Sequence, residues 1–283
     1  MAAGDRAIPV LTSIEEIAGA YDVWVVDIWG VLHNGVTSFP AAVAACSRFR
    51  DTGGRVVLVS NAPRPSPTIQ KQLDRLGVSR AAYDAMITSG DLTRSLIEER
   101  SARRVFHLGP ERDRVIFADM PVELVELEAA ELCVCSGLYD DRTETPEDYA
   151  DMLARLKSRD MPMICANPDL VVEHGELILY CAGALAQAYE VLGGVVIYAG
   201  KPHPPVYERA FGLVSGGRPL SRERVLAIGD GVRTDIAGAA RMGLSAVFIA
   251  SRVHVDGPLE ADLPRLFAGS AKPPIAAMTA LVW

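Results

Sequence analysis

The sequence predicts an α/β protein built on parallel sheets, with a second α/β unit inserted into the chain. Short apolar, β-branched runs alternate with segments that carry helix signals, and this alternation is typical of parallel sheets with helices on both faces. Polar residues directly follow several of these runs, where parallel sheets bind their ligands. Finally, the stretch between Asn61 and Lys201 is long enough to hold a unit with its own strands.

The individual elements are predicted from local patterns. Helices are indicated by Pro40, Pro67 and Pro146, which suit first helical positions, and by Thr12 with Glu15 three residues on, which has the spacing of a capping box. The predicted strands are Val23–Val26, Arg55–Ser60, Ala85–Thr88, Val105–Leu108, Leu132–Cys135, Pro162–Ala166, Val195–Tyr198, Val225–Ile228 and Ala246–Ala250.

Length and composition are those of a soluble enzyme with a sizeable core. The chain has 283 residues, of which 49% are hydrophobic and 23% charged, as in ordinary globular proteins. Its formal net charge of −8 argues against a broad nucleic-acid surface. An acidic total does not exclude a phosphorylated substrate, because a metal ion and a few cations reverse the charge inside a pocket.

The cysteines and the chain start indicate a cytoplasmic protein. Five cysteines are an odd number for a disulfide framework. Cys133 and Cys135 lack a second close pair for zinc, so we expect core cysteines. The N-terminal segment has no basic stretch followed by an apolar run, which argues against a signal peptide. We find no run of about 18 apolar residues, so no membrane partner is expected.

Four short motifs stand at predicted strand ends. They read DIWGVLHNG from Asp27, SN at Ser60–Asn61, GKP at Gly200–Pro202 and GDGVRTD from Gly229. In this order they resemble the four motifs of the haloacid dehalogenase superfamily. The GVLxxG continuation of the first motif, ANPD from Ala166, and CAGALAQAYE leading into GKP narrow the resemblance to class IIA, the NagD-like phosphatases.

The chemistry of these residues suits phosphoryl transfer, which needs a nucleophile, neutralised phosphoryl oxygens and in-line positioning. Asp27 is a carboxylate that can form an aspartyl phosphate. Asp230 can join Asp27 around Mg²⁺, which prefers hard oxygen ligands. Ser60 offers a hydroxyl donor to the phosphate, and Lys201 a positive charge that neutralises it.

The resemblance implies further assignments. Mg²⁺ would be the cofactor, bound also through the backbone carbonyl of Trp29. Asp235 would hold a water of the metal or orient Lys201. Asn61 would contact the phosphate or substrate. The loop at Asn167–Asp169, with His174 beyond it, would face the nucleophile and help to choose the substrate.

The resemblance also implies the domain organisation and the fold. Residues 1–98 and 195–283 would form a Rossmann-like core with a parallel sheet, and residues 99–194 an inserted α/β cap of class IIA (C2) type. Relatives of this class often pair through their caps, so a homodimer through the cap is an open expectation.

Each residue taken alone has a plainer explanation. An aspartate after a strand is most often a turn former or helix cap, as is a Ser-Asn pair. Asn-Pro-Asp reads equally well as a turn, and a single lysine is usually a surface residue. The four motifs together, in the family's order, favour one shared active site.

Trp29 departs from the family pattern, in which a second aspartate two residues after the nucleophile protonates the leaving group. Indole cannot shuttle protons near neutral pH, and losing a general acid–base typically lowers a rate about 10²–10⁴-fold. Three hypotheses follow. His33 acts as a surrogate; or the substrate has a leaving group that needs no proton; or the protein binds phosphate and metal without turnover.

The sequence therefore favours a phosphatase of small phosphorylated metabolites, of the sugar, aryl or acyl phosphate type. The alternative is a catalytically silent or regulatory protein that uses the same pocket. A phosphotransferase with the same intermediate is a third hypothesis. A dehalogenase is less favoured, because such relatives need no metal and would leave Asp230 and Asp235 unexplained.

Overall fold

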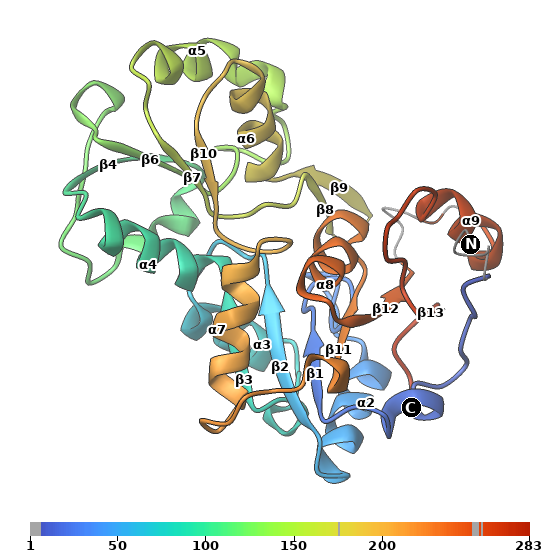
Figure 1. Cartoon of the computed structure of the whole chain (residues 1–283). Coiled ribbons are helices and arrows are strands. Elements are labelled where there is room, and N and C mark those ends of the chain that lie inside the picture. Colours follow the sequence, from blue (N-terminus) through green and yellow to red (C-terminus); the bar gives the residue numbers. More distant parts are fainter. Residues whose placement is uncertain (1–6, 175, 251–254, 256) are drawn as a thin grey trace. The chain divides into compact units, whose positions relative to one another are not determined.

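The computed structural model describes residues 7–174, 176–250, 255 and 257–283. Residues 1–6, on which the prediction about a signal peptide partly depends, lie outside the described residues. The chain divides into two compact units, whose elements are labelled in Figure 1. The core unit comprises the described parts of residues 1–59, 73–86 and 207–283, and the insert unit comprises residues 60–72 and the described parts of 87–206.

The central sheet of the core unit has strand order β13-β12-β11-β1-β2-β3. β1 (Val23–Val26) lies between β11 (Val225–Gly229) and β2 (Arg55–Ser60), parallel to both. Its Val26 pairs with Ile228 on one side and Leu58 on the other. All four β1 side chains are buried, as expected of a central parallel strand. The remaining strands are β3 (Ala85–Thr88), β12 (Ser245–Ile249) and β13 (Ala276–Met278).

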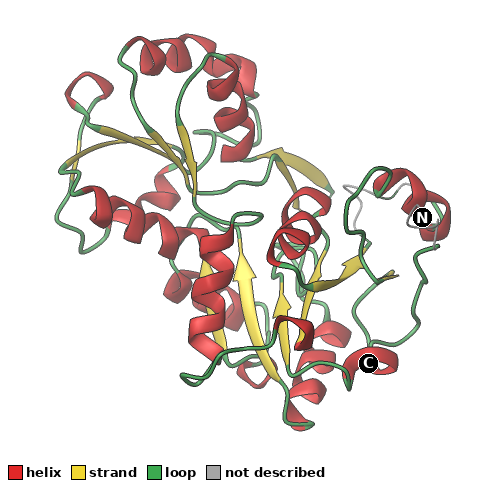
Figure 2. Ribbon diagram, viewed as in Figure 1, coloured by secondary structure: helices red, strands yellow, loops and turns green. Residues whose placement is uncertain are grey.

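Helices pack against this sheet (Figure 2). The contact between α2 (Pro40–Asp51) and β1 is aromatic: Phe49 stacks on the fully buried Trp24 with ring centroids 3.9 Å apart. The other helical elements of this part of the chain are α1 (Glu15–Ala18), α3 (Ser66–Arg75), η1 (Arg80–Ala82), α7 (Pro204–Val214), η5 (Arg222–Arg224), η6 (Val232–Ile236), α8 (Ala237–Met242) and α9 (Leu259–Leu266). α3 begins in the insert unit and continues into the core unit, while α7 begins at the end of the insert unit.

The insert unit has its own parallel sheet, of order β10-β7-β6-β4-β5. Its strands are β4 (Arg104–Leu108), β5 (Glu123–Leu124), β6 (Leu132–Cys135), β7 (Met163–Cys165) and β10 (Val196–Tyr198), and β8 (Val171–His174) with β9 (Leu177–Tyr180) forms an antiparallel pair. Its helices are α4 (Ser89–Arg100), η2 (Glu111–Phe117), η3 (Leu127–Ala129), η4 (Pro146–Tyr149), α5 (Ala150–Ser158) and α6 (Ala182–Val191).

The cysteines belong to the buried interior, as predicted. Cys133, Cys135 and Cys165 lie in the hydrophobic core of the insert unit beside Leu156 and Tyr189. All five cysteines of the chain are buried free thiols. Burial raises the pKa of the Cys135 thiol to about 12, so this group stays protonated and unreactive.

All nine predicted strands agree with the structure within one residue at either end. The structure also contains β5, β8, β9 and β13, which the sequence analysis missed. The capping box at Thr12 was wrong: α1 begins at Glu15, and Glu16 accepts hydrogen bonds from the Thr12 hydroxyl and the Ser13 N–H. No helix within the described residues combines the length and apolar character needed to cross a membrane.

The two compact units differ in extent from the predicted domain limits of 99 and 194. The insert unit also takes residues 60–72, 87–98 and 195–206. One reason lies in α4, which contacts η2 and β7 of that unit. The loop that begins at Ser60 belongs to the insert unit, whereas the other residues of β2 belong to the core unit.

Candidate active site

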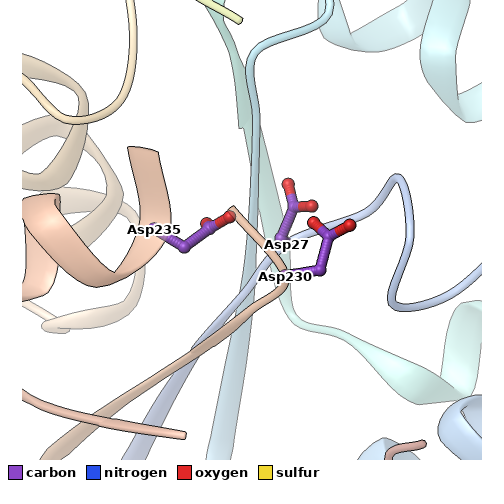
Figure 3. Close-up of side chains that lie close together, drawn as sticks. All are labelled: Asp27, Asp230 and Asp235. Atoms are coloured by element: carbon purple, nitrogen blue, oxygen red, sulfur yellow. The ribbon is translucent and has the colours of Figure 1, made fainter. Parts of the chain in front are cut away.

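Three aspartate side chains converge in the core unit (Figure 3). Asp27, Asp230 and Asp235 each offer a carboxylate oxygen, and these oxygens all lie within 4.8 Å of one another. Asp27 directly follows β1, Asp230 directly follows β11, and Asp235 lies in η6. The structure thus brings together three of the four predicted metal-site residues at the carboxyl ends of neighbouring parallel strands.

Backbone hydrogen bonds and glycines hold this arrangement. The Asp27 N–H donates to Ile228 O at 2.9 Å, which continues the pairing between β1 and β11. The Gly231 N–H donates to Asp235 Oδ2 at 3.0 Å and orients that carboxylate. Gly30 has φ +87°, and a Cβ there would lie 2.3 Å from Asp230 Oδ2. Only glycine accommodates both this conformation and this close approach.

The donor set fits a small divalent cation. Asp27 and Asp235 are 7% and 5% exposed, and carboxylates held this close repel one another strongly when poorly solvated. A divalent cation removes that repulsion, and carboxylate oxygens are the ligands that Mg²⁺ prefers. The cluster is therefore chemically suited to the metal that the sequence predicts.

Trp29 and His33 lie in the loop after β1 and contact each other. Their rings meet edge to face with centroids 5.1 Å apart. His33 is 1% exposed, and its Nδ1 accepts the Gly35 N–H at 2.9 Å. In the neutral ring this bond assigns the proton to Nε2. His33 is thus a buried, hydrogen-bonded residue, and Nε2 is the nitrogen that can donate a proton.

The insert unit brings a second group of predicted residues together around Asn61. Its side-chain Oδ1 accepts the Lys201 N–H at 2.8 Å, and its Nδ2 donates to Lys201 O at 3.2 Å. Nδ2 also donates to Asp169 Oδ1 at 3.0 Å. Ser89, which the sequence analysis missed, donates to Asn61 Oδ1 at 3.4 Å. Its position directly after the predicted strand Ala85–Thr88 was the available signal.

The remaining predicted residues occupy ordered loops. Ser60 is the last residue of β2, is 4% exposed, and accepts the Ala62 N–H at 3.1 Å. Asn167 accepts the Asp169 N–H through its side-chain oxygen at 3.1 Å. This bond closes the turn at Asn167–Asp169, so the turn interpretation holds for the Asn167 side chain. His174 lies on β8 and is partly buried.

Comparison with known proteins agrees with the motifs. Residues 24–123 match the family model described as haloacid dehalogenase-like hydrolase, and residues 198–270 match the model described as HAD-hydrolase-like. A haloacid dehalogenase-like hydrolase from Brucella suis 1330 is 45% identical over 96% of this chain and 100% of its own, with a TM-score of 0.86. The chain belongs to the haloacid dehalogenase-like hydrolase family.

Other structures of this family share the fold at lower identity. A possible sugar phosphatase from Cytophaga hutchinsonii has a TM-score of 0.79 at 20% identity, covering 96% of this chain and 98% of its own. NagD from E. coli K-12 has a TM-score of 0.66 at 19% identity, covering 92% and 97%. The core sheet with an inserted α/β unit is therefore the class IIA fold. No curated protein matches the chain significantly.

Proposed function

We propose that this hydrolase is a Mg²⁺-dependent phosphatase of small phosphorylated metabolites that acts through an aspartyl phosphate on Asp27. The observation that carries the proposal is the convergence of Asp27, Asp230 and Asp235 at the ends of β1 and β11. A 4-nitrophenylphosphatase from Thermotoga maritima, 22% identical with a TM-score of 0.71, has the same fold, which supports phosphate as the group transferred.

The proposed reaction has two displacements. A carboxylate oxygen of Asp27 attacks phosphorus while the bond to the leaving oxygen breaks, and a water then attacks the aspartyl phosphate and regenerates the carboxylate. The water's proton leaves with the phosphate or to solvent. Mg²⁺, bound by Asp27, Asp230, Asp235 and the Trp29 carbonyl, would supply neutralising charge to the phosphoryl oxygens.

Ser60 and Lys201 are proposed as the phosphate-binding partners of Asp27. Ser60 ends β2, the strand whose Leu58 pairs with Val26, and Asp27 follows Val26 directly. Lys201 would bring a positive charge that offsets the negative charge of the phosphate. We retain Asp169 and Asn167 as residues of the loop that helps to select the substrate.

Trp29 is expected to restrict which leaving groups the substrate can carry. No carboxylic acid stands at this position, so alkyl phosphates, whose leaving oxygen needs a proton, should react slowly. Aryl and acyl phosphates leave as stable anions and escape this requirement. His33 is the proposed alternative donor, acting through Nε2, because Nδ1 accepts the Gly35 N–H.

The proposal is tested by Mg²⁺-dependent phosphate release from p-nitrophenyl phosphate, acetyl phosphate and a sugar phosphate. We expect turnover that disappears in Asp27→Asn and with chelator, with the aryl and acyl substrates hydrolysed fastest. A His33→Ala variant whose pH–rate profile matches the wild type on the sugar phosphate would exclude His33 as the donor.

Trp29 also favours a second candidate function, a protein that binds phosphate and Mg²⁺ without turnover. Absence of phosphate release from all three substrates, with retained Mg²⁺-dependent phosphate binding by calorimetry, would support it. Transfer to an added alcohol would instead indicate a phosphotransferase.

A homodimer through the insert unit remains a separate proposal. Leu177, Ile178 and Tyr180 on β9 are exposed apolar side chains, and such clusters often mark interfaces. Light scattering on the wild type and on Ile178→Asp tests this pairing. A wild type that is monomeric at micromolar concentration would contradict it.

A further inference from the structure

The Asn61 side chain uses its whole hydrogen-bonding capacity inside the insert unit. Its two N–H groups donate to Asp169 Oδ1 at 3.0 Å and Lys201 O at 3.2 Å. Its oxygen accepts the Lys201 N–H at 2.8 Å and the Ser89 hydroxyl at 3.4 Å. A primary amide has two donors and two acceptor positions. Every one of them is occupied, and the side chain is 3% exposed.

We infer that Asn61 is a positioning residue that fixes Lys201 and not a phosphate ligand, and that Asp169 acts on Lys201 through Asn61. This inference rests on the proposed function, in which Lys201 neutralises the phosphate. It replaces the sequence-based expectation that Asn61 itself contacts the substrate. An amide already bonded four times would have to break one of those bonds to reach a phosphate oxygen, which would leave a buried polar group unpaired.

The bonds to Lys201 involve its main chain on both sides of Cα. The side-chain oxygen of Asn61 accepts the Lys201 N–H, and the side-chain nitrogen of Asn61 donates to the Lys201 carbonyl. Two such bonds fix both the position and the direction of the Cα–Cβ bond from which the lysine side chain starts. Lysine is long and has many rotamers, so a fixed origin reduces the volume that its ammonium group samples.

Gly200 completes this restraint from the preceding residue. Its φ is +158°, and a Cβ built there would lie 2.1 Å from Ser89 Oγ and 2.5 Å from Asn61 Oδ1. The main chain before Lys201 therefore packs directly against the amide and the hydroxyl. Gly200, Asn61 and Ser89 hold one conformation of the GKP segment between them.

Asp169 determines the orientation of the Asn61 amide. The Asp169 carboxylate accepts a hydrogen bond at 3.0 Å, so the amide nitrogen of Asn61 must face Asp169. The amide oxygen of Asn61 then faces the Lys201 N–H. A charged acceptor also makes this a stronger hydrogen bond than a neutral one. The loop at Asn167–Asp169 thus helps to place Lys201 through the Asn61 amide.

The deciding experiment is a double-mutant cycle on Asn61→Ala and Lys201→Met, with kcat and KM for p-nitrophenyl phosphate measured at saturating Mg²⁺. We expect Asn61→Ala to lower kcat/KM about 10–100-fold in the wild type and less than about 2-fold when Lys201 is already Met, since residues that act as a unit are not additive. Full multiplication of the two single effects, or an unchanged Asn61→Ala enzyme, would overturn the inference.

A carboxylate exchange tests the part played by Asp169. Asn61→Asp places two carboxylates about 3 Å apart, so we expect it to be more damaging than Asn61→Ala. Asp169→Asn in the same chain restores a donor and acceptor between positions 61 and 169. The double variant should therefore recover part of the activity. Absence of recovery would contradict the role of Asp169. The Ser89→Ala variant loses only the longest of the four contacts and should have the smallest effect.

Two further readouts separate this inference from other failures. A wild type without turnover on any substrate overturns the phosphatase proposal first; the same cycle is then measured by calorimetry with inorganic phosphate and Mg²⁺, where additive losses again count against Asn61. Thermal unfolding of every variant identifies loss of folding. A fall in activity that tracks the melting temperature in both backgrounds would mean that Asn61 is merely structural.

Discussion

Position 29 combines an indole side chain with a backbone carbonyl that is proposed to bind the metal. The side chain packs edge to face on His33 with ring centroids 5.1 Å apart, so it fills the space beside the nucleophile loop without supplying a titratable group. The backbone carbonyl is available whatever the side chain. We therefore expect a substitution of this side chain to change proton transfer and to leave the proposed metal site intact.

We predict that Trp29→Asp raises the turnover of a sugar phosphate by roughly 10²–10⁴-fold, because it supplies the missing general acid, and changes the turnover of acetyl phosphate little. Steady-state kinetics on both substrates measure this. Trp29→Asn is the matched control, with similar size and no proton to transfer. Equal gains in the Asn and Asp variants would show that the indole obstructs the substrate instead.

At the scale of elements, the loop after β1 is shaped by a glycine that faces the acidic cluster. Gly30 combines φ +87° with contact to Asp230. Gly53, after α2, has nearly the same conformation, φ +93°, and a Cβ added there would have nothing within 4 Å. An alanine at either position would strain the backbone, but only an alanine at position 30 would also displace the Asp230 carboxylate.

Gly30→Ala is predicted to raise the Mg²⁺ concentration for half-maximal activity about 10–100-fold, as for other changes that disturb a metal ligand's support. Both Gly30→Ala and Gly53→Ala should lower the free energy of unfolding by about 1–2 kcal/mol, since each places a Cβ at positive φ. Mg²⁺ titrations and urea unfolding check the pair. A similar Mg²⁺ requirement in both variants would contradict the role of Gly30.

His107 in β4, which is partly buried, and Asp113 in η2, which is buried, have opposite pKa shifts. His107 Nε2 lies 2.9 Å from Ser136 Oγ, and Asp113 also bonds to Ser136. Burial, with the Arg114 charge, lowers the pKa of His107 from 6.5 to about 4. Burial raises the pKa of Asp113 from 3.8 to about 6, against the opposing charge of Arg64.

These shifts act on stability with opposite signs. As pH falls from about 6 to about 4, native Asp113 binds a proton that the unfolded chain does not, which stabilises the fold. Over about pH 6.5 to 4, unfolded His107 binds a proton that the native chain does not, which destabilises it. The two contributions therefore offset each other in the wild type.

The His107→Gln variant should retain only the contribution of Asp113. As the pH is lowered from 7 to 4.5, the free energy of unfolding of this variant should therefore rise relative to wild type by about 1–3 kcal/mol. Asp113→Asn should change in the opposite direction over the same interval. Urea unfolding at the two pH values measures both. Variants that shift together, or not at all, would contradict the assignment.

At the scale of the whole molecule, the carboxylates of the acidic cluster belong to the core unit, while Asn61, Asp169 and Lys201 belong to the insert unit. The two units have separate sheets and interiors. Binding of the metal alone should therefore stabilise one unit in preference to the other.

We predict that Mg²⁺ increases hydrogen-exchange protection in β1 and β11 and leaves β4 and β6 nearly unchanged. At 100 times its dissociation constant, a ligand that binds only the native state adds about 2.7 kcal/mol of stability. Asp230→Asn is the control and should lose most of the effect. Equal protection of both units, or an effect that persists in Asp230→Asn, would contradict this assignment.

The chain by itself determined the central strands and the motif residues, because both depend on local signals: β1 and β2 are short runs of branched apolar residues, Asp27 directly follows β1, and Ser60 ends β2. It did not indicate β5, β8, β9 or β13, all of which are short: β5 and β13 lie at the edges of their sheets, and β8 and β9 pair only with each other. Tertiary structure also decided the bonding of Asn61. The partners of Asn61 lie up to 140 residues away along the chain, and hydrogen bonds between such distant residues form only when the folded backbone brings them together.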